Sequence, residues 1–103
     1  MNITNNHIEY ITQTVFKNHT VKYAINDFIK KFNGTDNMFL GGKVEVDYDS
    51  LYNAYVLDKA LTAIRQESAF KSVSIAHDCT ARYFKIEPTE LVKIIKSIKG
   101  KLK

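Results

Sequence analysis

The chain has 103 residues, of which 45% are hydrophobic and 25% are charged, as is ordinary for a folded domain. This composition excludes a chain that is disordered throughout, and the length fits one domain, residues 1–103. No apolar run approaches the roughly 20 residues that span a bilayer, and the first residues lack the basic start and apolar stretch of a secretory signal. We therefore expect a cytoplasmic protein without membrane contact.

The formal net charge of +4 is unevenly distributed along the chain. Residues 1–81 carry eight basic and nine acidic side chains, whereas residues 82–103 carry seven basic and two acidic ones. The excess positive charge therefore lies entirely near the C-terminus. A basic end on a neutral body suits a polyanionic partner such as nucleic acid, and a lysine-rich tail that only increases solubility is the alternative.

Residues 1–34 contain an N-terminal pair of predicted helices. Apolar residues recur at helical spacing within residues 6–17 and again within residues 20–32. Thr20 can cap the second helix, and Asn33–Gly34 can end it. This pair can complete the core, form a homodimer or bind a partner protein, and the sequence leaves these roles open.

The middle of the chain predicts a hairpin. Two short β-prone runs flank a glycine pair within residues 38–46, which favours a β-hairpin, with a glycine loop over a ligand as the alternative. A phosphate-binding loop is not predicted, because Val44 follows the lysine where Ser or Thr is required.

A longer helix is predicted over residues 49–67. Its expected inner stripe consists of Leu51, Ala54, Leu57, Leu61 and Ile64. Tyr48, Tyr52, Tyr55 and Val56 widen this face. A tyrosine row can stack nucleic-acid bases, but core or interface packing is the interpretation that we favour.

Two further helices are predicted after residue 70. Ser72 or Ser74 begins the first of them, which ends near Tyr83. Pro88 suits the first turn of the last helix, where no amide donor is needed. The chain would then close with a basic tail over residues 100–103.

The segment 77–96, HDCTARYFKIEPTELVKIIK, meets the packing requirements of two short helices that cross steeply. It has a small residue at the crossing, apolar residues around the turn and two inward residues on the second helix. In chain order these are Ala81, Phe84, Ile86, Leu91 and Ile94. On these positions the segment resembles the helix-turn-helix unit. The resemblance implies a three-helix unit over residues 49–99.

The segment departs from the helix-turn-helix pattern at Lys85 and Thr80. The turn usually holds glycine in left-handed backbone, and Lys85 there would cost about 1 kcal/mol, unless the turn is longer, as in winged-helix relatives. Thr80 replaces a usual apolar residue. Too few residues follow the last helix to form a wing. The predicted fold class is thus mostly α, a helix-turn-helix-containing small domain of about five helices, with the short hairpin at 38–46.

The resemblance places a set of side chains on the nucleic-acid side of the domain. These are Arg82, Lys85, Thr89, Lys93, Lys96, Lys99, Lys101 and Lys103. Thr89, Lys93 and Lys96 would face the major groove, and the others would lie nearer phosphates. Glu87 and Glu90 argue against tight contact at the front of the last helix, because carboxylates repel phosphate.

No enzyme, metal or cofactor signature is evident in the sequence. His77 and Cys79 would point about 200° apart on a helix, so they could not share a metal. Cys79 is expected to be a small core residue. Asp47 and Asp49 are better explained as helix caps than as metal ligands.

The function that we predict is a small, non-enzymatic helix-turn-helix DNA-binding protein. The alternative is an accessory subunit that binds a larger replication or regulatory protein of a mobile genetic element. A phage-type inhibitor or an antitoxin is a third hypothesis. Helix-turn-helix units also serve as protein docking modules, and a fold does not fix a function.

Overall fold

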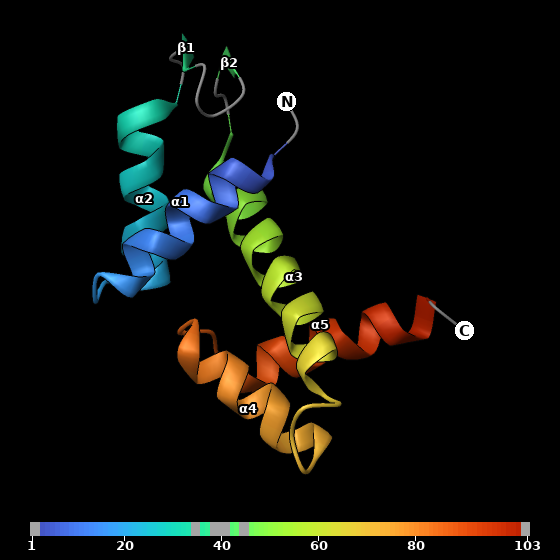
Figure 1. Cartoon of the computed structure of the whole chain (residues 1–103). Helices are drawn as coiled ribbons and strands as arrows, with labels where there is room; N and C mark the ends of the chain where they lie inside the picture. Colours follow the sequence, from blue (N-terminus) through green and yellow to red (C-terminus); the bar gives the residue numbers. More distant parts are fainter. Residues whose placement is uncertain (1–2, 34–35, 38–41, 44–45, 102–103) are drawn as a thin grey trace. The chain divides into compact units, whose positions relative to one another are not determined.

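The computed structural model describes residues 3–33, 36–37, 42–43 and 46–101, and this part of the chain is mostly helical (Figure 1). Its five helices are α1 (Asn5–Phe16), α2 (Val21–Phe32), α3 (Tyr48–Gln66), α4 (Val73–Tyr83) and α5 (Pro88–Lys101). The prediction of a small all-α protein with about five helices is thereby confirmed. The chain divides into two compact units, Met1–Tyr55 and Val56–Lys103, whose boundary falls inside α3.

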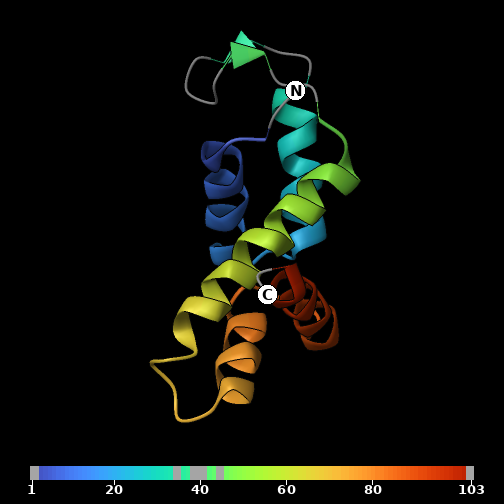
Figure 2. The same cartoon turned by 90° about the vertical axis from the view of Figure 1, so that its right-hand side faces the viewer.

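The first unit contains α1 and α2, which lie side by side (Figures 1 and 2). Thr4 caps α1 in a capping box with His7, since each residue's side chain accepts the backbone N–H of the other. Thr20 caps α2 as predicted, by accepting the Tyr23 N–H at 3.0 Å. The apolar stripe of α2 is buried, and Phe28 at its centre has no exposed surface.

A pair of two-residue strands follows α2: β1 (Asp36–Asn37) and β2 (Gly42–Lys43). They pair antiparallel, with Asp36 opposite Lys43 and Asn37 opposite Gly42. The hairpin expected over residues 38–46 falls largely outside the described residues and stays a prediction. At the end of this range, the N–H of Val46 donates to Asn33 Oδ1 at 2.8 Å. This bond ties the segment just before α3 to the residue just after α2.

Helix α3 buries only part of the face that was expected. Leu51 is fully buried as predicted, but Leu57 and Leu61 are 46% and 39% exposed. Tyr55 and Val56 are buried as expected, and the buried face continues through Ala60 and Ala63, which were not expected there. The predicted inner stripe is therefore wrong at Leu57 and Leu61, because the alanine side of the helix allows closer packing than the leucine side.

The tyrosine row of α3 is partly core. Tyr55 has no exposed surface, which confirms packing for this residue. The rings of Tyr48 and Tyr52 stack on each other with centroids 6.1 Å apart, and both residues are half-buried.

The second unit is built from α4, α5 and the C-terminal part of α3. Ser72, one of the two serines expected to begin α4, caps it by accepting the Ile75 N–H at 3.1 Å. Pro88 is the first residue of α5, as predicted. Among the described residues, no helix is long and apolar enough to cross a membrane.

Candidate nucleic-acid interface

The turn between α4 and α5 is the short one of the two alternatives, with Lys85 in left-handed backbone. The Ile86 N–H donates to the Ala81 carbonyl at 2.8 Å, and the Lys85 N–H donates to the Arg82 carbonyl at 3.3 Å. These two bonds form a Schellman motif, which ends a helix with one left-handed residue. Lys85 is that residue, with φ at 58°. Its side chain costs about 1 kcal/mol in this conformation, which the fold must offset elsewhere.

Most of the side chains that were expected to hold the two helices together are buried. Ala81 and Leu91 have no exposed surface, and Ile86 retains 5%. Ile94 is only half-buried, and Ile95, which directly follows it, is 1% exposed. The inward face of α5 is therefore centred on Leu91 and Ile95.

Phe84 is half-buried beneath a lysine of α3. The Lys59 Nζ lies 4.5 Å from the centre of the Phe84 ring and 2.9 Å from Asp58 Oδ2. Lys59 itself is only 6% exposed. The neighbouring carboxylate and the face of the ring compensate its buried charge. This cation belongs to the support of the turn rather than to the basic surface.

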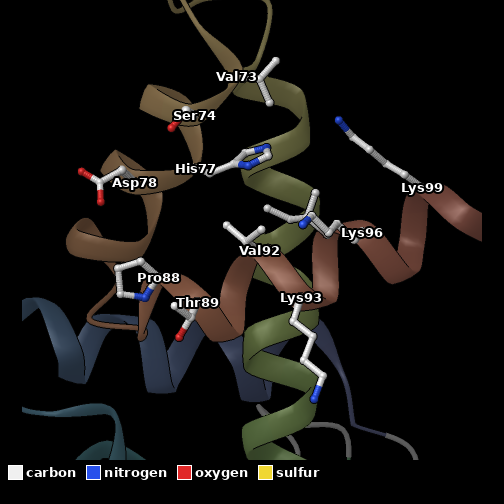
Figure 3. A pocket seen from close by; sticks show the side chains of 11 residues that line it. Val73, Ser74, His77, Asp78, Pro88, Thr89, Val92, Lys93, Lys96 and Lys99 are labelled. Atoms are coloured by element: carbon white, nitrogen blue, oxygen red, sulfur yellow. The ribbon is translucent and has the colours of Figure 1, made fainter.

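A groove lies between α4 and α5 (Figure 3). Its lining residues are Val73, Ser74, His77, Asp78, Pro88, Thr89, Val92, Lys93, Ile95, Lys96 and Lys99. The α5 side of the groove therefore contains four of the predicted site residues, Thr89, Lys93, Lys96 and Lys99. Thr89, Lys93 and Lys96 are exposed, on the side of α5 opposite to the buried Leu91.

Lys99 is held by an ion pair within the unit. Its Nζ lies 2.8 Å from Glu67 Oε1, while Glu67 Oε2 lies 2.8 Å from His77 Nε2. The hydrogen bonds from Lys99 and then from His77 lower the pKa of Glu67 below its usual value. Sequence reasoning missed Glu67 as the common partner of Lys99 and His77, because the pairing does not follow from local spacing. A phosphate would have to compete with Glu67 for this lysine.

The remaining predicted cations are dispersed around the turn and the end of α5. Arg82 pairs with Asp78 one turn earlier at 2.7 Å, with the arginine side chain 77% exposed. Lys85 and Lys101 are exposed. Lys103 lies outside the described residues. Lys93 and Lys96, which are both exposed, are therefore the accessible basic pair on α5, whereas Lys99 is ion-paired with Glu67.

Two glutamates lie at the front of α5, as the sequence indicated. Glu87 and Glu90 are both exposed. Carboxylates at a helix N-terminus interact favourably with the helix dipole. They also place negative charge before and after Thr89 in the chain, so the basic surface begins at Lys93, about one turn after them.

Cys79 is exposed, and the expectation of a core cysteine is wrong. It lies on the rim of a shallow pocket with Phe70 and Tyr83. His77, two residues earlier, is 8% exposed, and Ala76 and Ala81 fill the buried side of α4. Within the described ranges, no three His, Cys, Asp or Glu side chains are grouped so that they could hold a metal ion.

Comparison with known proteins adds no functional assignment to this geometry. No protein-family model, curated protein or solved structure matches the chain.

Proposed function

We propose that this chain is a small helix-turn-helix DNA-binding protein that contacts nucleic acid through the basic side of α5. The observation that carries the proposal is the pair Lys93 and Lys96, exposed on α5 while Leu91 and Ile95 fix the opposite side of the helix in the core. The left-handed turn at Lys85 supports it, because such a turn separates two helices within a few residues. A helix presented in this way can enter the major groove.

The charges define how such a contact would work. Lys93 and Lys96 would neutralise phosphates and release the counterions bound there, so affinity would fall as salt rises. Thr89, one turn before Lys93, can donate to a phosphate or a base edge. Glu87 and Glu90 would keep the extreme N-terminus of α5 away from phosphate. Contact would therefore centre on the middle of α5.

The test is a salt titration of duplex binding with a charge-matched control. The Lys93→Ala/Lys96→Ala variant removes the accessible pair, and Arg65→Ala/Lys71→Ala removes two exposed cations outside α5. We expect the first variant to bind more weakly and to lower the slope of log affinity against log salt by about 2, since two phosphate contacts are lost. The control should leave the slope unchanged. Equal behaviour of the two variants, or binding that does not depend on salt, would reject the proposal.

The groove favours a second candidate, the accessory subunit that binds a larger protein. Its exposed apolar wall includes Val73, which is 45% exposed, and its floor includes Val92 and Ile95. A phosphate backbone would leave this apolar surface in water, whereas a protein segment would cover it. Val73→Asp should then abolish co-purification with the product of a neighbouring gene, while duplex binding by the isolated chain stays weak and unchanged.

A further inference from the structure

The end of the first unit where α1 joins α2 exposes aromatic rings. Phe16, the last residue of α1, is 45% exposed, and Tyr23, in the first turn of α2, is 50% exposed. The ring of His19 stacks on that of Tyr23, with centroids 4.1 Å apart and planes 18° from parallel. We call these residues, together with Lys17 and Lys22, the α1–α2 tip.

The charge around the α1–α2 tip is positive. Lys17 and Lys22 are exposed, and residues 16–23 contain no acidic side chain. The nearest following carboxylate, Asp27, has an 18% exposed side chain and interacts with Lys31 at 3.5 Å and with the Tyr10 hydroxyl at 3.4 Å. Lys30, two turns after Tyr23 on the same face of α2, is exposed and extends the positive surface along the helix.

The backbone of the tip is fixed by its own hydrogen bonds. Asn18 adopts φ of 75° and donates its N–H to the Val15 carbonyl at 3.0 Å, which ends α1. The Thr20 hydroxyl accepts the Tyr23 N–H and thereby starts α2 around the tyrosine. The stacked rings are consequently presented on a preformed turn, which reduces the entropy that a ligand must offset on binding.

We propose that the α1–α2 tip binds single-stranded nucleic acid, with an unpaired base stacked at Tyr23 and His19 and phosphates at Lys17 and Lys22. Flat aromatic surfaces between cations are the arrangement that tracks a single strand without reading its sequence, because every base has a π-face. A duplex keeps its bases stacked internally and cannot supply one. This surface belongs to the first unit and does not depend on the proposed role of α5.

The experiment measures binding of the full chain to fluorescent oligomers of about 16 nucleotides. This length is more than a single stacking site needs to cover. The oligomers are oligothymidylate, oligouridylate, an abasic deoxyribose-phosphate strand and a duplex. Thymidylate and uridylate distinguish DNA from RNA as the source of the base. We expect both base-bearing single strands to bind at least about fivefold more tightly than the abasic strand.

Tyr23→Ala should weaken oligothymidylate binding about tenfold and bring its affinity to that of the abasic strand. Tyr23→Phe keeps the ring and should retain the preference. Tyr83→Ala is the matched control, since Tyr83 is 65% exposed on α4. Lys17→Ala/Lys22→Ala should weaken the binding of all single strands alike. This variant also tests whether the α1–α2 tip is the binding surface if Tyr23→Ala proves unstable. The proposal is overturned if wild type binds no single strand, if it binds abasic and base-bearing strands equally, or if Tyr23→Ala binds like Tyr83→Ala.

The two binding proposals fail separately. Loss of salt-dependent duplex binding in Lys93→Ala/Lys96→Ala with an unchanged preference for base-bearing over abasic strands supports both of them. If the α5 variant instead lost its preference for base-bearing over abasic strands, the stacking contact would lie on the second unit. That result would overturn the assignment to the α1–α2 tip.

Discussion

The carboxylate of Glu67 lies 2.8 Å from the ammonium Nζ of Lys99, 32 residues later in the chain. Its second oxygen lies equally close to His77 Nε2, so one acidic side chain just after α3 is bonded to both α4 and α5. The Glu67 side chain is 17% exposed, which limits screening by solvent. This relationship pairs the charge of Lys99, whose side chain is 42% exposed, with a carboxylate and makes Lys99 part of the structural support of the second unit.

Glu67→Gln should destabilise the protein by about 1–2 kcal/mol at neutral pH, because hydrogen bonds to a charged group are lost. The pKa of Glu67 is lowered in the folded state, first by Lys99 and then by His77. Its stabilising contribution is therefore complete above its usual pKa of 4.5 and is lost as the pH falls through the lower folded value. Urea unfolding between pH 7 and acid should show a smaller decline for Glu67→Gln than for wild type.

The control for that measurement is Glu87→Gln, which removes an exposed carboxylate from the same unit. Its pH profile should stay closer to that of wild type than the profile of Glu67→Gln does, because only the weaker interaction of an exposed carboxylate with the helix dipole is lost. Parallel profiles for wild type and Glu67→Gln would show that the paired carboxylate contributes nothing to stability.

Lys85→Gly should stabilise the protein by up to about 1 kcal/mol, because glycine adopts the left-handed backbone without the steric cost that lysine incurs. The gain is reduced by the greater conformational freedom of glycine in the unfolded chain. Thermal or urea unfolding of Lys85→Gly and of wild type measures this gain in stability. Lys85→Ala keeps a Cβ and should show no gain. If the glycine variant were less stable than the alanine variant, the left-handed strain at this position would be refuted.

The parts of the fold that sequence reasoning predicted are those set by neighbours in the chain. The Thr20 cap and the Pro88 start each follow from the backbone chemistry of a few residues, whereas the left-handed backbone at Lys85 was only one of two alternatives. The contacts that define the interface are different. The pairing of Lys99 with Glu67 joins residues far apart in sequence, and no periodicity indicates it.

Burial on α3 and α4 escaped prediction for a related reason. Helix α3 carries two apolar faces, and hydrophobicity favours the one with Leu57 and Leu61. The face that is buried includes Ala60 and Ala63, because small residues allow a neighbouring segment to approach closely. Cys79 was assigned to the core on residue type alone, although Ala76 and Ala81 already occupy the buried side of α4.

Cys79 should react with a thiol reagent in the native protein at a rate close to that of the unfolded chain, since the residue is exposed. The measurement is the time course of Ellman's reagent with and without urea. Cys79→Ser should alter the free energy of unfolding by no more than about 0.5 kcal/mol, as is usual for surface substitutions. A thiol that reacts only after unfolding would contradict the exposed position.

Ala81→Leu should destabilise the protein by about 1–3 kcal/mol, because Ala81 has no exposed surface and a larger side chain must displace its neighbours. Ala69→Leu is the matched control, since Ala69 is exposed in the segment between α3 and α4. Leu91→Ala, on α5, should lower the free energy of unfolding by about 2–5 kcal/mol, because it leaves a cavity in the core. Urea unfolding of the three variants measures these differences.

The same variants test whether the packing of α4 against α5 supports nucleic-acid binding. If the basic pair acts from a fixed helix, Ala81→Leu should weaken duplex binding even under conditions where the variant remains folded, since displacing α5 moves Lys93 and Lys96 together. The slope of affinity against salt should then stay near the wild-type value, because both cations remain present. A variant that loses stability but keeps full affinity would show that binding needs the lysines and not the helix pair that presents them.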